Sequence, residues 1–229
     1  MGILKELQTN KCTYCHDQDI KNGIYIDIEW RDNNYNGCWP KPYQESGLNN
    51  DNIKAVVIGQ DPTIEDPRPI EYALEVNKEN SNLGVFLREV FGMLPSIKFN
   101  ELYFTDLIKC RFKEKPGKGN RNISRFLDEL AKQCFSTFLE REIIQFKNAR
   151  YLFTLGRDCF NILAGLLHVK HRSLTDFKDY YGKQLDVPLE VFGRSCYLIP
   201  LPHQPTYDLA KRYSPYSKVE VERRLKDIS

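Results

Sequence analysis

The chain has 229 residues, of which 41% are hydrophobic and 28% charged, and its formal net charge is only +2. This composition is typical of a globular protein with a sizeable core, and it excludes a polycation. It also excludes a membrane-spanning segment, since no apolar run approaches the roughly 20 residues that a spanning helix needs. Residues 1–7 lack the apolar core of a secretory signal, so we expect a cytoplasmic protein with no membrane partner.

Hydrophobic periodicity along the chain predicts strands that alternate with helices. Residues 23–30 alternate like an edge strand, 31–51 resemble a loop, and 168–193 fit neither pattern. We expect buried strands over 53–59, 102–108, 150–155 and 196–201. We expect helices over 83–91, 124–147, 157–167 and 215–227. This alternation predicts a single α/β domain over residues 1–229, with a parallel sheet covered on both faces and with 1–50 as an N-terminal extension.

Polar side chains follow two of the predicted strands. Gln60 and Asp61 come directly after strand 53–59, and His203 follows strand 196–201. Because ligands bind outside the carboxyl ends of strands in open α/β sheets, Asp61 and His203 are candidate reacting groups. The alternatives are a turn or capping role for Asp61 and an ordinary loop position for His203.

Basic residues gather in two segments near these strand ends. Residues 109–125 hold seven basic residues against the single acid Glu114, and a second group interleaves basic and tyrosine side chains after His203. Such segments can neutralise phosphates and favour binding of nucleic acid, although a solvated surface loop is the alternative. The candidate DNA-binding residues are Lys113, Lys115, Lys118, Arg121, Tyr207, Lys211 and Arg212.

The chain has seven cysteines, an odd number, which argues against a disulfide scaffold. The C-x2-C pair Cys12 and Cys15 presents two thiolates to one metal or cluster, which would need two further ligands. The candidates for these are Cys110, Cys134, Cys38 and His16. Cys159 and Cys196 lie within apolar patterns and are expected to be buried as small hydrophobic residues.

Several segments together resemble the uracil-DNA glycosylase superfamily, over roughly residues 12–210. Gly59-Gln60-Asp61-Pro62 matches its first motif, and residues 63–66 and 103–111 are similar to its iron-sulfur (family 4-like) branch. Leu155-Gly156-Arg157 matches a later segment, and Pro202-His203-Gln204-Pro205-Thr206 stands where the family has a His-Pro-Ser motif. The resemblance implies a three-layer α/β/α fold around a central, mainly parallel four-stranded sheet.

The resemblance also implies an activity and a site. It implies a monomeric DNA-repair glycosylase that hydrolyses the N-glycosidic bond of a flipped damaged base, uracil or a related deaminated base. Asp61 would orient the attacking water and stabilise the positively charged sugar, and His203 would hydrogen-bond the departing base. The base-binding positions are Gln60, Thr63, Tyr72, Leu74 and Asp106.

The cysteines of that branch hold a structural 4Fe-4S cluster. By resemblance, the ligands here are Cys12, Cys15, Cys110 and Cys134. Structural zinc on the same four cysteines, or reduced thiols without a ligand, are the alternatives.

The departures from the family concern mainly the base. Asp106 stands where the family has an asparagine, and an ionised carboxylate only accepts hydrogen bonds, so it would repel the uracil carbonyl unless protonated. It could instead accept from an exocyclic amino group, or turn away to a backbone donor or basic neighbour. Leu74 aligns nearest to the aromatic residue that stacks on the base, and Tyr72 is a close alternative.

Other departures leave two further readings open. Thr63 replaces a tyrosine that excludes thymine, and Gln204 splits the His-Pro pair, which leaves Tyr207 and Leu209 as candidates for the wedge that replaces the base. One alternative is therefore a weak or inactive superfamily member that binds DNA or a nucleotide-like ligand. The other is an unrelated intracellular α/β protein with a structural zinc site.

Overall fold

A computed structural model describes residues 42–45, 49–62, 70–78, 81–109, 121–170, 180–202, 218–226 and 228. For residues 121–126 and 218 this description is limited to the backbone. The predicted strand over 23–30 and most of the predicted N-terminal extension lie outside the described residues, so the domain boundaries stay a prediction.

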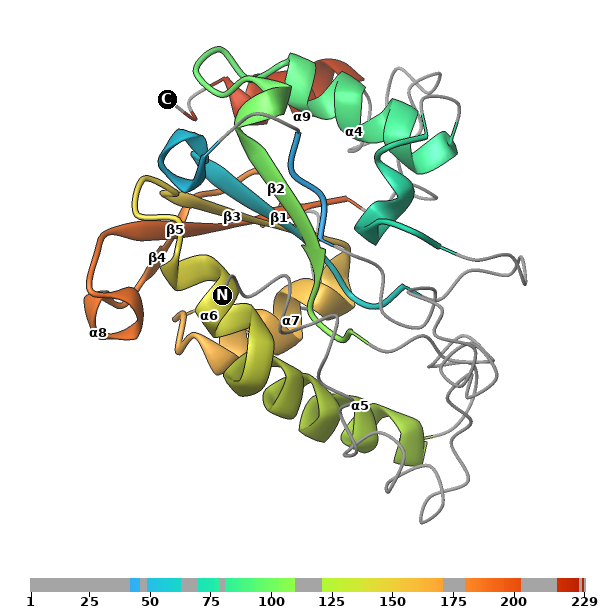
Figure 1. Ribbon diagram of the computed structural model, residues 1–229, viewed down its shortest axis with the longest axis vertical. Coiled ribbons are helices and arrows are strands. Elements are labelled where there is room, and N and C mark those ends of the chain that lie inside the picture. The colour runs from blue at the N-terminus through green and yellow to red at the C-terminus, as the bar shows by residue number, and fades with distance from the viewer. Residues whose placement is uncertain are drawn as a thin grey trace.

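A five-stranded sheet in the order β2-β1-β3-β5-β4 forms the centre of the molecule (Figure 1). Its four parallel strands match the four predicted buried strands: β1 (Ala55–Gly59), β2 (Leu102–Asp106), β3 (Tyr151–Leu155) and β5 (Cys196–Leu201). The fifth strand, β4 (Leu185–Val187), pairs antiparallel with β5 at the edge. The predicted α/β fold is thus confirmed, with one more strand than the resemblance implied.

Helices cover both faces of the sheet. Every residue of β1, β2 and β3 is therefore buried. One core cluster joins the sheet to α4 (Asn82–Gly92) and α9 (Lys218–Leu225). The other joins it to α5 (Arg121–Cys134), α6 (Glu140–Ile144) and α7 (Arg157–Leu166). Figure 1 shows the two groups of helices on opposite sides of the strands.

The helices begin and end close to where the periodicity predicts them. Ser81 caps α4, its hydroxyl accepting from the Gly84 N–H at 2.9 Å. The long predicted helix over 124–147 is α5 and α6 joined by the π-helical segment η4 (Phe135–Leu139). The short elements are η1 (Asn50–Asn52), η2 (Ala73–Glu75), η3 (Phe99–Glu101) and α8 (Leu189–Phe192).

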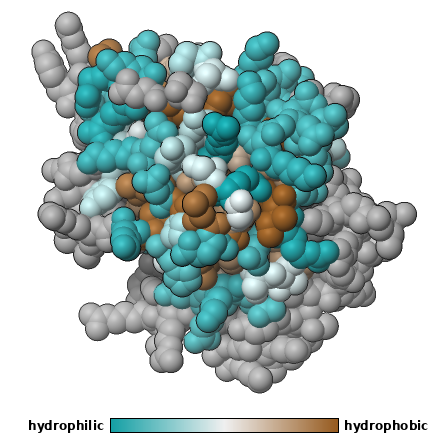
Figure 2. Space-filling view, turned by 90° about the vertical axis from the view of Figure 1, so that its left-hand side faces the viewer, coloured by the Kyte–Doolittle hydropathy of each residue, from teal (hydrophilic) through white to brown (hydrophobic). Residues whose placement is uncertain are grey.

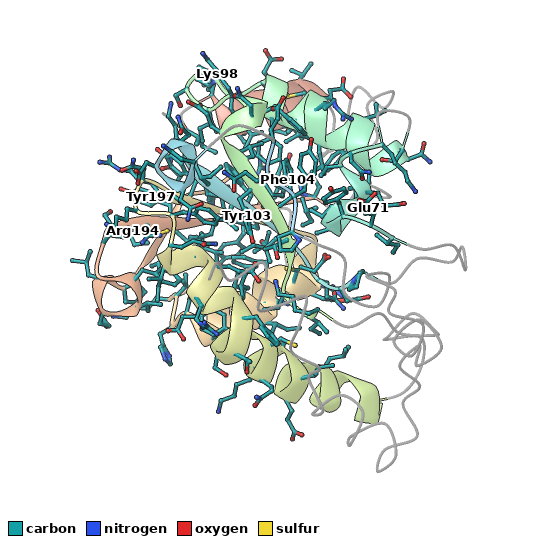
Figure 3. All side chains as sticks on the ribbon, viewed as in Figure 1. Glu71, Lys98, Tyr103, Phe104, Arg194 and Tyr197 are labelled. Carbon is teal, nitrogen blue, oxygen red and sulfur yellow. The ribbon has the colours of Figure 1, made fainter. Side chains whose placement is uncertain are left out.

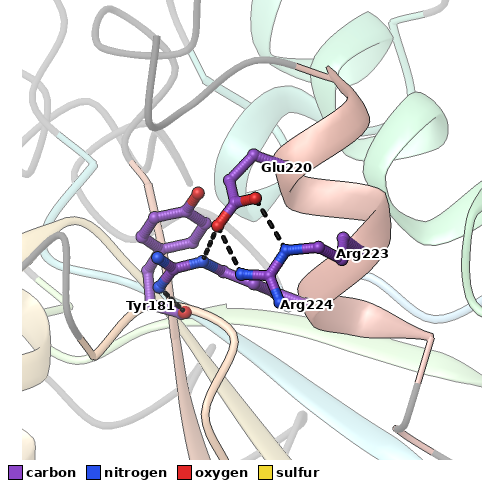
Figure 4. A network of polar contacts seen from close by, with 4 residues as sticks. All are labelled: Tyr181, Glu220, Arg223 and Arg224. Atoms are coloured by element: carbon purple, nitrogen blue, oxygen red, sulfur yellow. Dashed lines mark hydrogen bonds and ion pairs between the residues drawn. The ribbon is translucent and has the colours of Figure 1, made fainter. Parts of the chain in front are cut away.

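The helix α9 is fastened to the loop before β4 by a polar network (Figure 4). Glu220 accepts hydrogen bonds from Arg223 at 2.6 and 2.8 Å and from Arg224 at 2.7 Å. The Arg224 guanidinium lies 4.1 Å from the centre of the Tyr181 ring and donates to the Tyr181 carbonyl at 3.2 Å. The next residue, Gly182, has a φ of +75° and leaves no room for a side chain beside Arg224.

The surface of the described part is mostly polar. On the side that carries β4 and α8, apolar side chains form patches between polar ones (Figure 2). The exposed large apolar residues come from four different helices: Val85, Ile144, Leu189 and Val219. Within the described ranges, no helix is long and apolar enough to cross a membrane.

Candidate active site

The carboxyl ends of the four parallel strands meet at one edge of the sheet. β1 ends at Gly59, which pairs in register with Asp106 at the end of β2. The backbones stay paired beyond the strands, since the Leu107 N–H donates to the Gly59 carbonyl at 2.8 Å and the Ile108 N–H to the Gln60 carbonyl at 2.9 Å. This pairing holds half-buried Gln60 and Asp61 beside the chain that leaves β2.

The exit of β5 lies at the same edge, separated from β1 by β3 alone. Leu155 pairs with Leu201, and the Gly156 N–H donates to the Leu201 carbonyl at 2.9 Å, so β3 and β5 end level with each other. Two strand spacings place the ends of β1 and β5 roughly 10 Å apart. His203 itself lies outside the described residues, two positions after the end of β5.

Because Gly59 has no side chain, two other side chains can lie over the end of β1. A methyl group placed on its Cα would lie 2.4 Å from Asp106 Oδ1 and 2.5 Å from Leu74 Cδ2. The carboxyl of Asp106 and the leucine therefore share the space that any larger residue at 59 would fill. The structure thus brings together two of the predicted base-binding residues, Leu74 and Asp106, next to Gln60.

Asp106 is held in an environment that favours its protonated form. It is 3% exposed, and its Oδ1 accepts no hydrogen bond within the described part of the chain. Burial raises the pKa of Asp106 to about 7; the ammonium of Lys109 opposes this rise, while the carboxylates of Asp61 and Glu142 add to it.

Leu74 has a backbone conformation that is unusual for a branched residue. Its φ of 58° and the φ of 49° at Glu75 lie in the left-handed region, which costs non-glycine residues of the order of 1 kcal/mol each. The turn is held by a hydrogen bond from the Glu75 N–H to the Tyr72 carbonyl at 3.0 Å and by an ion pair between Glu75 and Lys78 at 2.7 Å. Backbone strain of this kind persists only where the surrounding structure holds it, and it is found most often at functional sites.

Tyr72, the other candidate for stacking on the base, packs against a different ring. Its ring lies edge-on to that of Tyr43, with centroids 5.4 Å apart. Burial, followed by the charge of the neighbouring Glu71, raises the pKa of its hydroxyl. Figure 3 shows Glu71 on the side of the molecule where β2 ends, with Arg194 on the opposite side. Of the two candidates, Leu74 is the one whose side chain lies over Gly59 beside Asp106.

A buried ion pair supports the exit of β2 from the other face of the sheet. Lys109 Nζ lies 2.7 Å from Glu142 Oε1 and donates to Thr105 Oγ1 at 2.6 Å, and the Thr105 hydroxyl donates to Glu142 Oε2 at 2.7 Å. The Tyr103 hydroxyl also donates to Glu142, at 3.4 Å. Figure 3 shows Tyr103 and Phe104 on β2, which pack into the two opposite core clusters.

This network corrects the prediction of a basic, phosphate-binding loop over 109–125 at its first residue. Lys109 is 6% exposed and paired with Glu142, so it does not face phosphates. Arg121 is the first residue of α5, and its side chain is not among the described ones. The other predicted DNA-binding residues lie outside the described part: Lys113, Lys115, Lys118, Tyr207, Lys211 and Arg212.

Of the four predicted cluster ligands, Cys134 lies within the described residues, and Cys12, Cys15 and Cys110 lie outside them, as does the base-binding candidate Thr63. Cys134 ends α5, is 1% exposed and belongs to the same buried cluster as Ile108. Cys159 and Cys196 are buried, as predicted, and burial raises the pKa of both thiols.

The sequence reasoning missed three features of this site. They are the role of Gly59, the buried pair of Lys109 and Glu142, and the left-handed turn at Leu74. A signal existed for the pair, since Glu142 falls on the apolar face of its helix, between Leu139 and Ile143, where a charged residue needs a buried partner. For the turn, the residue types gave no signal, because leucine and glutamate are not typical of this conformation.

Comparison with known proteins identifies the family of the chain. The chain matches none of the curated proteins compared with it. A family model described as the uracil DNA glycosylase superfamily matches residues 46–221, which is 176 of the 229 residues. The matched range holds the whole sheet and the positions of Asp61, Asp106 and His203. The chain therefore belongs to the uracil DNA glycosylase superfamily.

Proposed function

We propose that this chain is a DNA-repair glycosylase that hydrolyses the N-glycosidic bond of a flipped, deaminated base such as uracil. Its superfamily consists typically of DNA N-glycosylases, which supports both the reaction and a DNA substrate. The observation that carries the proposal is the pair of carboxyl groups at one sheet edge, half-buried Asp61 after β1 and buried Asp106 at the end of β2, with Leu74 beside Asp106.

The two carboxyl groups have environments suited to different tasks. Cleavage of the glycosidic bond builds positive charge on the sugar and negative charge on the departing base. In the proposed mechanism, the carboxylate of Asp61 stabilises the sugar and orients the attacking water. Asp106, which is held away from water, faces the base together with Gln60, and Leu74 packs against its ring. Enzymes commonly give two carboxyl groups different roles by placing them in environments that move their pKa values apart.

His203 supplies the donor for the departing base in this proposal. Its position two residues after the end of β5 supports the role, because β5 ends at the same sheet edge as β1. An imidazole there would donate a hydrogen bond to the base carbonyl as it gains negative charge, a contact that is stronger in the transition state than in the substrate. Thr63 and Tyr72 would border the base, and the basic residues named above would bind the DNA backbone.

We also propose that Cys12, Cys15, Cys110 and Cys134 hold a structural 4Fe-4S cluster. Cys134 fits this role because it is buried at the end of α5, in the same core cluster as Ile108, which stands two positions before Cys110. Lys109 anchors the same stretch to Glu142 on α6. The cluster would cross-link the N-terminal segment to this region and take no part in hydrolysis.

The cluster proposal has its own test. The purified protein should show a broad visible absorption band and contain about four irons per chain. Cys134→Ser should lose both, whereas Cys196→Ser, at a buried cysteine on β5, should keep them. One zinc per chain without visible absorption would replace the cluster by a zinc site.

An oligonucleotide panel tests the glycosylase proposal. Single-stranded and duplex DNA carrying uracil, hypoxanthine, xanthine, cytosine or a mismatch is incubated with the protein, and abasic sites are detected by alkaline cleavage. We expect abasic sites with at least one deaminated base, and a loss of about 100-fold or more in Asp61→Asn and His203→Ala, since single groups of this kind contribute factors of this order. DNA binding without release of any base would instead support an inactive superfamily member.

A further inference from the structure

We propose that Asp106 reads the base as a neutral carboxylic acid, which donates its proton to the 4-carbonyl of uracil and accepts from the adjacent N3–H. This inference rests on the proposed function and deepens it by naming the group that selects the base. It also gives a reason why an aspartate can stand where the family has an asparagine.

The geometry places an unsatisfied carboxyl oxygen in the proposed base site. Asp106 is 3% exposed, and within the described part of the chain its Oδ1 accepts no hydrogen bond. The same oxygen lies over Gly59 next to Leu74. A buried polar atom without a partner is costly, so its persistence beside a proposed ligand site indicates that a ligand completes it.

The charged groups around Asp106 explain why it can keep a proton. Lys109, from the same strand end, is the cation that acts on it, but Lys109 is already paired with the buried Glu142 on α6. The carboxylate of Asp61, at the end of β1, adds negative charge, and the thiol of Cys159 on α7 is kept neutral by burial. Burial raises the pKa of Asp106 to about 7; the ammonium of Lys109 opposes this rise, and the carboxylates of Asp61 and Glu142 add to it.

The protonated group has the hydrogen-bonding capacity that uracil requires. A carboxylic acid has one O–H donor and one carbonyl acceptor, as the amide of asparagine has an N–H donor and a carbonyl acceptor. These match the 4-carbonyl and the N3–H of uracil. After ionisation both oxygens only accept, and the 4-carbonyl is repelled. Recognition of uracil is therefore present below the pKa of Asp106 and falls tenfold for each pH unit above it.

The test compares two oligonucleotides that cannot be cleaved. One carries 2′-fluoro-arabino-uridine, whose glycosidic bond resists hydrolysis, and the other carries a tetrahydrofuran abasic analogue at the same position. The ratio of their dissociation constants, measured by fluorescence anisotropy from pH 6 to 8.5, isolates the contribution of the base. Any titration of the DNA-binding groups affects both probes and cancels. Titration of His203, which is proposed to contact the base, is common to the wild type and Asp106→Asn, so comparing the two proteins separates it from titration of Asp106.

With a pKa of about 7, the preference for the uridine probe should fall about 30-fold between pH 6 and pH 8.5 in the wild type. Asp106→Asn keeps the donor and acceptor without an ionisable group, so its preference should change less than about threefold over the same range. At pH 8.5 the variant should therefore prefer the uridine probe more strongly than the wild type does.

Three outcomes would overturn the inference: a wild-type preference that does not change with pH, an equal fall in Asp106→Asn, or no preference for the base at any pH. Since the first of these needs the wild type alone, a folding defect in the variant leaves the inference falsifiable. Neither probe is cleaved, so failure of the glycosylase proposal is detected separately. A preference with the expected pH dependence but no base release from the panel would support base reading by Asp106 in a protein that does not excise.

Discussion

Replacing Gly59 by alanine tests whether the end of β1 is shaped to admit Asp106 and Leu74. The added methyl would lie 2.4 Å from Asp106 Oδ1 and 2.5 Å from Leu74 Cδ2, closer than carbon contacts allow. Asp106 has little freedom to move, because it is buried and paired in register with residue 59. Overpacking a core in this way costs about 1–3 kcal/mol.

The expected result is a double loss. Urea unfolding at pH 7 should show Gly59→Ala to be about 1–3 kcal/mol less stable than the wild type. Because the displaced atoms are those proposed to contact the base, the affinity for the 2′-fluoro-arabino-uridine probe should also fall about tenfold or more, whereas the abasic probe should be affected less. Displacements near 1 Å in a binding site have effects of this size.

Gly165→Ala is the matched control. Gly165 is an exposed residue of α7, and a methyl group there would meet no atom within 4 Å. Alanine should stabilise the helix by about 0.5–1 kcal/mol and leave binding of both probes unchanged. Equal stability of the Gly59→Ala variant and the wild type, with equal affinity for the uridine probe, would refute the proposed packing.

Three further predictions concern buried and paired charges. Lys109→Met leaves the buried charge of Glu142 without its cation, so urea unfolding should show a free energy of unfolding about 3–5 kcal/mol lower than that of the wild type. The double variant Lys109→Met/Glu142→Gln should restore much of this loss, and a loss below about 1 kcal/mol in the single variant would contradict the ion pair. The pKa of Asp106 rises from 3.8 to about 7 on folding, so wild-type stability should fall as pH rises from 4 to 7, by up to about 4 kcal/mol at 1.36 kcal/mol per pKa unit. Asp106→Asn should lack this fall, and parallel stability curves would count against a protonated Asp106. The hydrogen bonds from Arg223 and then Arg224 lower the pKa of Glu220 to about 2. Glu220→Gln should therefore reduce the melting temperature at pH 7 but not at pH 2. A difference in melting temperature between variant and wild type that does not shrink between pH 4.5 and 2 would be inconsistent with this pairing.

The sheet could be predicted from the sequence because its parallel strands are buried on both faces. Strands in that position read as continuous apolar runs, as Ala55-Val56-Val57-Ile58 does. The strand β4 escaped prediction, since it has three residues and only Val187 is buried, which leaves no period to detect. The π-helical segment η4 was also not predictable, because its residues continue the apolar spacing of α5 into α6.

The candidate site could be predicted in part, for a physical reason. A polar residue that follows an apolar strand lies at the sheet edge whatever the rest of the fold, so Asp61 could be located from local sequence. Asp106, the last residue of β2, lies within the predicted strand over 102–108, and it is the family resemblance that assigns it to the site. What Asp106 does there depends on groups far along the chain. Leu74 lies over Gly59 beside Asp106, and Lys109, the cation that acts on Asp106 within the described residues, is paired with Glu142. Neither contact can be predicted from local spacing. The sequence therefore located the carboxyl group but not its protonation.

Release of the free base is the measurement that tests the central claim most directly. Single-turnover reactions on a uracil-containing oligonucleotide at pH 6.5, followed by chromatography of free uracil, should show release by the wild type, with a rate reduced about 100-fold or more in Asp61→Asn. The Gly165→Ala control should release uracil at the wild-type rate. If the wild type binds this DNA and releases no base, or if Asp61→Asn releases it at the wild-type rate, the sheet edge formed by β1 and β2 is not a base-excision site.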